Sequence, residues 1–424
     1  MSGAASTPIP GRWRYPGCPP PLGHYRPNPG VTRMSVRALS NLSVEHAVSE
    51  RYGAAAQARE AALCCPVSYD PALLRAIPEE VLERDYGCGD PSRYLQPGER
   101  VLDLGSGGGK VCFIASQVVG PEGAVIGVDM NEEMLALARR SAPTVAAAVG
   151  FSNVRFARAR IQDLALDLDA FDRYLASSPA DSVGAFSRAE AEAERLRRQT
   201  PLIADGSVDV VISNCVLNLV EASQKARMFD ELFRVVRVGG RVVISDIVAD
   251  EAVPDHLRQD PELWTGCVSG ALREDEFLLA FERAGFRALT IASRAVDAWR
   301  TVEGIEFRSM TIVAWKHSDG PCLDHKDAVV YKGPFREVLD DDGHRLRRGV
   351  RTAVCRKTFN VFSQAPYREH VELIDPVVPV AEGDARPFPC TGGTLVRDPR
   401  ETKGEDYNLT TDAAALCSGE DGCC

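Results

Sequence analysis

The chain has 424 residues, of which 45% are hydrophobic, so it is long enough to build two or more domains with substantial cores. Its formal net charge of −11 argues against a nucleic-acid or anionic-membrane partner. It contains no apolar run of about 18 residues and no apolar signal-peptide core, so we expect neither a membrane span nor secretion. In such a chain the 13 cysteines are expected to be thiols, metal ligands or redox groups.

The N-terminal part begins with a tail. Residues 1–43 are rich in Pro, Gly and Arg, and no acidic residue precedes Glu45. This composition predicts a disordered tail. The scarcity of acids is also typical of an organellar transit peptide, so organellar import stays open beside the expected cytoplasmic location. After further helical sequence, residues 70–77 and 78–84 are expected to form two short helices.

A glycine-rich turn organises the centre of the chain. Residues 101–110 read V-L-D-L-G-S-G-G-G-K, a short strand running into a turn with a helical pattern behind it. This is the opening of a nucleotide-binding βα unit. The dinucleotide fingerprint fails because Lys110 stands at its third glycine. With Asp103 before the turn and Asp129 at the end of the next strand, the pattern resembles the S-adenosylmethionine (SAM) pocket of class I methyltransferases. A NAD-binding or ligand-free domain is the alternative.

Strand and helix patterns alternate from this turn onward, which predicts a Rossmann-like, mostly parallel doubly wound sheet. An insertion at 167–203 interrupts the alternation, and its residues 187–199 form a charged helix for which Ser187 is the expected N-cap. The expected strands are 100–104, 124–129, 153–157, 207–213, 240–247, 287–293 and 308–315, and the expected helices are 109–119, 131–147, 223–237 and 273–284.

The domain organisation follows from these patterns and from a later change of composition. We expect residues 44–250 to hold N-terminal helices and the SAM-binding core, and residues 251–317 to hold a cap and the last core strands. Residues 318–415 combine Pro, Gly and Asp turns with short Val, Thr and Phe runs, which indicates a small β-rich domain. Residues 416–424 end in Cys423 and Cys424 and are expected to be a flexible tail.

Three cysteines lie in loops beside places where class I methyltransferases keep their active site. Cys88 precedes the first core strand and Cys267 lies in the cap region, whereas Cys215 follows the fourth core strand, at the end where ligands bind in open α/β sheets. Three converging thiolates make a soft trigonal site. Zn²⁺ would usually take a fourth ligand and close C-x-x-C spacing, whereas a trivalent arsenical fits three sulfur atoms and keeps a lone pair.

The motifs around these cysteines make a resemblance specific. Y-G-C-G at 86–89, the SAM turn, S-N-C-V-L-N-L at 213–219 and G-C-V-S-G-A-L at 266–272 together resemble the arsenite methyltransferases. The similarity covers about residues 45–317. The doubled Cys64-Cys65 and the insertion after Leu166 resemble the branch associated with arsenosugar synthesis in photosynthetic organisms.

The resemblance implies methyl transfer from SAM to As(III), a reaction of arsenic detoxification. Cys88, Cys215 and Cys267 are then the arsenic ligands, and Cys64 or Cys65 is a redox thiol that thioredoxin or glutathione regenerates. The expected partners are therefore small arsenicals and a thiol reductant, and the chain is expected to act as a monomer.

The same resemblance assigns the SAM contacts. Asp103 and the glycines would line methionine and ribose, Asp129 would bind the ribose hydroxyls, and Asn214 would lie beside the methyl group. Tyr86 can meet the sulfonium through its ring face. The expected cofactor-binding residues are Tyr86, Asp103, Gly105, Ser106, Gly107, Asp129, Met130, Ile161, Gln162 and Asn214.

Two other functions remain open at this point: a SAM-dependent C-methyltransferase for a quinone or sterol type acceptor, and a non-catalytic arsenical binder. Cys112, on a core-facing helix, is expected to be buried in the core. Cys355 and Cys390 receive no role. Cys322 with His325 offers only two ligands in a loop, which is too few to predict a metal site.

Overall fold

The computed structural model describes residues 67–84, 86–260, 263–264, 266–318, 320–390 and 393–403. The chain divides into two compact units, Met1–Lys316 and His317–Cys424. Within the described residues, no helix has the length and apolar character that crossing a bilayer requires. The predicted tails 1–43 and 416–424 and the paired Cys64 and Cys65 lie outside the described residues.

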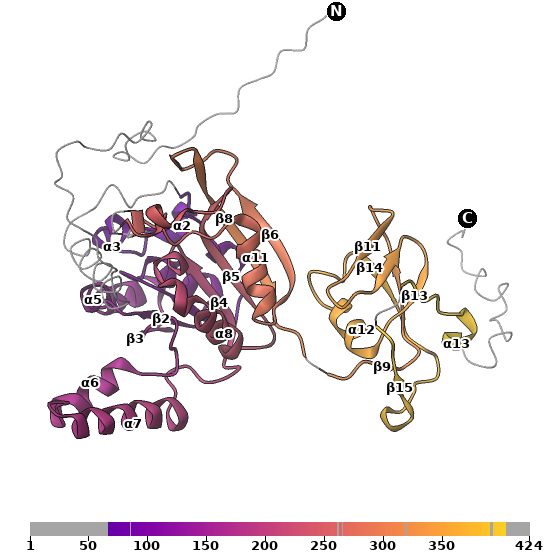
Figure 1. The fold of residues 1–424 in the computed structure, drawn as a ribbon, viewed down its shortest axis with the longest axis horizontal. Coiled ribbons are helices and arrows are strands. Elements are labelled where there is room, and N and C mark those ends of the chain that lie inside the picture. Colours follow the sequence, from indigo (N-terminus) through magenta and orange to yellow (C-terminus); the bar gives the residue numbers. More distant parts are fainter. Residues whose placement is uncertain are drawn as a thin grey trace, which may run out of the picture. The chain divides into compact units, whose positions relative to one another are not determined.

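The first unit is built on one mixed sheet in the order β3-β2-β1-β4-β5-β8-β6 (Figure 1). The five strands from β3 to β5 are parallel, and β8 runs antiparallel to both β5 and β6. This confirms the predicted Rossmann-like fold. The strands are β1 (Arg100–Leu104), β2 (Ala124–Asp129), β3 (Val154–Arg158), β4 (Val208–Asn214), β5 (Val236–Ala249), β6 (Arg287–Arg294), β7 (Arg300–Val302), which pairs with β8, and β8 (Ile305–Trp315).

Alternate residues of the strands pack into two separate cores, because successive side chains point to opposite faces of a sheet. In β1, Leu102 and Leu104 join the core that contains Phe229 and Phe281, whereas Val101 joins the other core. Both faces are therefore covered, as a parallel sheet requires. The covering helices are α4 (Lys110–Val119), α5 (Glu132–Val149), α8 (Lys225–Val235) and α11 (Glu274–Arg283), and the shorter elements are α2 (Pro71–Leu74), α3 (Glu79–Glu83), η2 (Pro91–Tyr94), η3 (Leu217–Leu219), η4 (Ala222–Gln224) and α9 (Asp255–Arg258).

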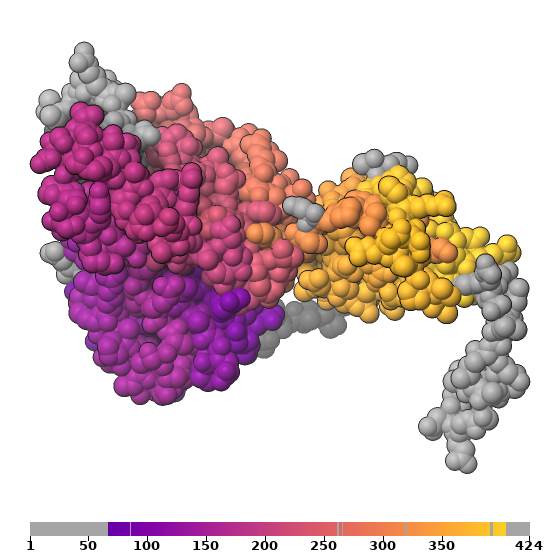
Figure 2. Space-filling view, turned by 90° about the horizontal axis from the view of Figure 1, so that it is seen from below, coloured from indigo at the N-terminus to yellow at the C-terminus, as the bar shows by residue number. Residues whose placement is uncertain are grey.

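The insertion forms two helices rather than one, α6 (Leu168–Ser177) and α7 (Val183–Gln199), which lie to one side of the sheet (Figure 1). The prediction of Ser187 as N-cap is wrong. The N-cap of α7 is Ser182, whose extended backbone lets its side chain accept a hydrogen bond from the Ala185 amide at 3.2 Å. From below, the magenta insertion forms part of the outer surface of the first unit (Figure 2).

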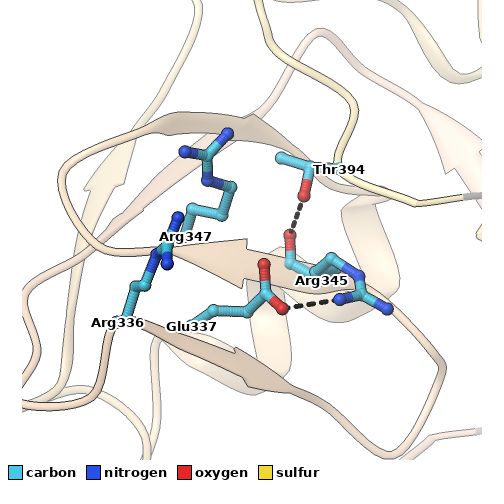
Figure 3. A pocket seen from close by; sticks show the side chains of 5 residues that line it. All are labelled: Arg336, Glu337, Arg345, Arg347 and Thr394. Carbon is cyan, nitrogen blue, oxygen red and sulfur yellow. Dashed lines mark hydrogen bonds and ion pairs between the residues drawn. The ribbon is translucent and has the colours of Figure 1, made fainter.

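The second unit is β-rich, as predicted. Its central sheet has the order β13-β10-β14, beside two further strand pairs, β11-β12 and β9-β15. An exposed hollow of about 540 Å³ beside β11 and β12 is lined by Arg336, Glu337, Arg345, Arg347 and Thr394 (Figure 3). The elements are β9 (Leu323–Asp324), β10 (Ala328–Tyr331), β11 (Glu337–Leu339), β12 (Arg345–Arg347), β13 (Arg351–Ala353), α12 (Arg356–Phe362), β14 (Val371–Ile374), η5 (Glu382–Asp384), β15 (Arg386–Pro387) and α13 (Pro399–Lys403).

Candidate active site

A cavity of about 130 Å³ lies at the carboxyl ends of β1, β2 and β4, the edge where ligands bind in open α/β sheets. All ten residues for which the sequence predicts SAM contacts line this cavity, and Cys215 lines it with them. The sequence missed several further lining residues, among them Arg84, Lys110 and Met134. Lys110 carried a signal that was not used, since it directly follows the glycine run of the turn.

The glycine-rich turn brings the backbone close to this cavity. Gly105 has a φ of +65°, and a Cβ atom there would lie 2.5 Å from the Val216 side chain. Both facts require glycine at this position. The next residue, Ser106, donates its backbone amide to the Val128 carbonyl at 3.0 Å. Its hydroxyl oxygen is buried and has no hydrogen-bond partner among the described residues, so it is free to bond a ligand.

Asp129 already has backbone partners. Its Oδ2 accepts the Gly107 amide at 2.9 Å and its Oδ1 accepts the Asn131 amide at 2.8 Å. Burial raises the pKa of this carboxyl, and the amide bonds oppose that effect. The carboxylate thus braces the glycine turn, and each oxygen keeps acceptor capacity for a ribose hydroxyl.

Asp103 also has a neighbour that the sequence did not suggest. The Cys112 thiol donates to Asp103 Oδ2 at 3.1 Å, and both side chains are buried. Burial raises the pKa of the Cys112 thiol well above its usual value, and the Asp103 charge adds to the effect. Cys112 is therefore a protonated core residue, as predicted, and it also helps to hold Asp103 at the cavity.

The three cysteines that were predicted to bind arsenic lie in one buried cluster. Cys88 and Cys215 are joined as a disulfide with their Cα atoms 5.8 Å apart, so they are not free thiolates in this redox state. Cys267 is not in a disulfide, and its thiol donates to the Cys215 carbonyl oxygen at 3.3 Å. At this site the ligand atoms of Cys88, Cys215 and Asp246 all lie within 4.8 Å of one another, and this group does not include Cys267.

Two of these cysteines have an unusual backbone. Cys215 has a φ of 60° and Cys267 a φ of 61°, in the left-handed region that residues other than glycine rarely adopt. Such a conformation costs about 1–2 kcal/mol and persists where the surrounding structure enforces it. Here the Cys215 amide donates to the Ser245 carbonyl at 2.8 Å and the Cys267 amide to the Trp264 carbonyl at 3.0 Å.

Asn214 fastens the loop of Cys88 to the end of β4. Its Oδ1 accepts the amides of Cys88 at 2.8 Å and Gly89 at 3.0 Å, and its Nδ2 donates to the Gly89 carbonyl at 2.7 Å and the Tyr69 hydroxyl at 3.1 Å. Although Asn214 lines the cavity, these bonds engage its amide with the loop. At Gly87 a Cβ atom would lie 2.1 Å from Asn214 Nδ2, which explains the glycine there.

Two buried charged residues beside the cysteines were not predicted. Asp246 accepts hydrogen bonds from the Leu217 amide and from Asn218 Nδ2, both at 2.9 Å, and burial raises its pKa to about 6. Lys225 Nζ donates to the Gly270 carbonyl at 2.6 Å, and burial lowers its pKa to about 8. An acid inside the apolar strand V-V-I-S-D-I-V was a usable signal for Asp246, because an unpaired buried carboxyl is costly.

Comparisons with known proteins show what this chain is similar to. A methyltransferase domain family matches residues 95–203 and 186–285, and a domain of unknown function (DUF8838) matches residues 318–407.

The crystal structure of an arsenic(III) S-adenosylmethionine methyltransferase from Chlamydomonas reinhardtii has a TM-score of 0.49 and 27% identity, over 76% of this chain and 100% of that chain. The arsenite methyltransferase of Mus musculus is 28% identical over 372 residues, 84% of this chain and 88% of its own length. That of Aquipseudomonas alcaligenes is 33% identical over 331 residues, 73% of this chain and 84% of its own length. The 33% identity to the Aquipseudomonas alcaligenes enzyme over most of both proteins, together with the cysteine cluster beside the cavity, shows that the chain belongs to the arsenite methyltransferase family.

Proposed function

We propose that this chain methylates trivalent arsenic with SAM while the sulfur atoms of Cys88, Cys215 and Cys267 hold the arsenic. The observation that carries the proposal is the position of Cys215. It lines the cavity, its sulfur pairs with that of Cys88, and its carbonyl accepts the Cys267 thiol. The core 44–250 would then supply the SAM site and two thiols, and the cap 251–317 the third thiol.

The cavity residues fit SAM. The Ser106 hydroxyl is a buried group without a partner among the described residues, and Gly105 leaves room for close approach of a ligand. Asp129 offers acceptor capacity for the ribose, and Tyr86 offers a ring for the sulfonium. When bound, SAM supplies an electrophilic methyl group on sulfur.

Arsenic binding requires reduced thiols. A thiol reductant must first open the Cys88–Cys215 disulfide, which is then available as two thiols. Arsenous acid condenses with three thiols: three As–S bonds form, three As–O bonds break and three water molecules leave. A carboxylate oxygen of Asp246 lies within 4.8 Å of the sulfur atoms of both Cys88 and Cys215. It can accept a thiol proton and return it to a departing hydroxide.

The residues contribute to methyl transfer mainly by positioning. The arsenic lone pair forms the As–C bond as the methyl–sulfur bond breaks, and no proton leaves the nucleophile, so no general base is needed. Fixing arsenic at the mouth of the cavity converts an encounter between two molecules into an aligned step, an effect of about 7–11 kcal/mol in favourable cases.

Turnover needs electrons, because methylation formally converts As(III) to As(V). Two thiols that join as a disulfide supply two electrons and two protons and return the product to As(III). We assign this part to Cys64 or Cys65, with thioredoxin or glutathione reducing the disulfide afterwards.

The insertion that forms α6 and α7 supports assignment to the branch associated with arsenosugar synthesis.

One assay tests the proposal. The full chain is incubated with arsenite, SAM and a thiol reductant, and arsenic species are separated and detected by mass spectrometry. Methylated arsenic that requires both SAM and reductant is the expected result. SAM consumed on a quinone or sterol with no methylated arsenic would favour a C-methyltransferase. Arsenite binding without SAM turnover would favour a non-catalytic binder.

A further inference from the structure

A second group of three thiols lies in the other unit, within the region matched by the domain of unknown function. Cys322, Cys355 and Cys390 hold their sulfur atoms within 4.8 Å of one another. They are all the cysteines of that unit which the structure describes, and none of them is in a disulfide. The fold therefore brings together every described thiol of this unit.

Three separate segments supply these cysteines. Cys322 immediately precedes β9, and Cys390 follows β15, which pairs with β9. The Phe388 amide donates to the Cys322 carbonyl at 2.8 Å and fixes these two segments side by side. Cys355 stands at the start of α12, where its sulfur accepts the Thr358 amide at 3.4 Å. Backbone contacts on each segment thus position the sulfur atoms.

The surroundings allow a small ligand to enter. Cys355 is fully buried and packs with Ala353 and Phe388, whereas Cys322 and Cys390 are partly exposed. A ligand can therefore approach Cys322 and Cys390 from solvent, and Cys355 meets it from the interior of the unit. The surroundings also include polar groups, since the Cys355 thiol donates to the Thr358 hydroxyl at 3.3 Å and the Lys357 ammonium interacts electrostatically with Cys322 and Cys355.

The donor set also selects the ligand. Structural Zn²⁺ takes four ligands, and among the described residues no fourth Cys, His, Asp or Glu joins this group. A divalent cation binds thiolates, so each of these thiols has to release its proton to bind one. Arsenous acid is neutral: three As–S bonds replace three As–O bonds, three water molecules leave, and neither net charge nor oxidation state changes.

We propose that Cys322, Cys355 and Cys390 form a second binding site for a trivalent arsenical, outside the methyl-transfer site. The assignment depends on these three sulfur atoms alone. It stands whether or not Cys88, Cys215 and Cys267 bind arsenic in the proposed way.

The first test counts arsenic atoms. In a full-length background with Cys88→Ser, Cys215→Ser and Cys267→Ser, the reduced protein is loaded with arsenite, desalted and analysed for arsenic per chain. Adding Cys322→Ser and Cys390→Ser should lower the ratio by one arsenic. The control Cys417→Ser, added instead, should leave it unchanged. An equal ratio with and without the Cys322 and Cys390 substitutions overturns the proposal.

The second test uses the unsubstituted chain, so it does not depend on a variant's folding. Arsenite should protect Cys322 and Cys390 together from alkylation by N-ethylmaleimide, read by peptide mass spectrometry, and arsenic X-ray absorption should show three sulfur neighbours. Full alkylation in the presence of arsenite overturns the proposal, as does a disulfide within the group that persists under reductant. One tightly held zinc per chain that arsenite cannot displace from these cysteines would also overturn it.

Discussion

Asn214, the last residue of β4, accepts a hydrogen bond from the backbone amide of Cys88 at 2.8 Å across 126 residues of sequence. The same side chain accepts the Gly89 amide and donates to the Gly89 carbonyl. Because Cys215 directly follows Asn214, one amide group sets the spacing of two sulfur atoms. Asn214 is thus a positioning residue for the thiols.

Replacing Asn214 with Ala should therefore lower the free energy of unfolding by about 1–3 kcal/mol, since it leaves partly buried backbone groups without partners. Arsenite affinity should fall further than SAM affinity, because the thiol loop loses its anchor while the glycine turn keeps its own. Urea unfolding and equilibrium binding of each ligand check this. Asn214→Asp keeps the acceptor for the Cys88 amide and loses the donor to Gly89, so its arsenite affinity should lie between wild type and Asn214→Ala. Equal loss of both affinities in Asn214→Ala would contradict the positioning role.

Gly105→Ala should weaken SAM binding at least tenfold, because the added methyl meets Val216 in a backbone conformation that favours glycine. Gly105→Ala/Val216→Ala removes the side-chain overlap but keeps the φ of +65°, so it should recover part of the affinity. Equilibrium dialysis with SAM measures both.

A matched control for Gly105 exists outside the cavity. Gly98 has a φ of +82° and open space where its Cβ would lie. Gly98→Ala should cost about 1 kcal/mol of stability and leave SAM affinity unchanged. SAM binding by Gly105→Ala at the wild-type level would show that the turn does not approach the ligand.

Asp246 should make stability depend on pH in a defined window. Its pKa is about 6 in the folded chain against a usual 3.8, so the folded state binds more protons between these values. Stability therefore falls as pH rises from about 4 to about 6, by about 3 kcal/mol if each pKa unit counts about 1.4 kcal/mol. Asp246→Asn should lack this contribution. It should also carry a constant penalty, because the new amide NH2 replaces one carboxylate oxygen and then faces a donor, either the Leu217 N–H or Asn218 Nδ2.

Urea unfolding of Asp246→Asn and wild type at several pH values separates the two effects. The difference between the two free energies should change across the window from about pH 4 to about pH 6 and stay flat above pH 7. A difference that is the same at every pH would mean that Asp246 does not titrate in this window.

The sheet and the cavity could be predicted because their signals are local. Short apolar runs that alternate with helical patterns indicated the strands, and Gly105 and Asp129 marked the turn and the acid at neighbouring strand ends. Helix α6 also had a local signal that was missed, with Asp167 as N-cap accepting the Ala170 amide. This segment was predicted only as part of the insertion, without a helix of its own.

Relationships between distant segments were not predictable in this way. Nothing near Asp246 in sequence shows that it lies beside Cys88, and nothing near Lys225 shows that it bonds Gly270. The thiol cluster of the second unit has the same origin: Cys322 and Cys390 meet only because β9 pairs with β15. Strand pairing at long separation is a property of the fold, and no local pattern encodes it.

The left-handed backbone at Cys215 separates the chemical from the conformational role of this residue. Cys215→Gly and Cys215→Ala both remove the sulfur, so both should abolish arsenite methylation. They should differ in stability, because glycine adopts a φ of 60° freely whereas alanine does not. Under reducing conditions, in which the wild-type disulfide is absent, Cys215→Gly should be more stable than Cys215→Ala by about 1 kcal/mol. Urea unfolding in the presence of reductant measures the difference.

If alanine proves the more stable of the two, the cavity left by the thiol or the entropy of glycine outweighs the backbone strain. The strain would then not be a significant cost of placing this sulfur at the cavity.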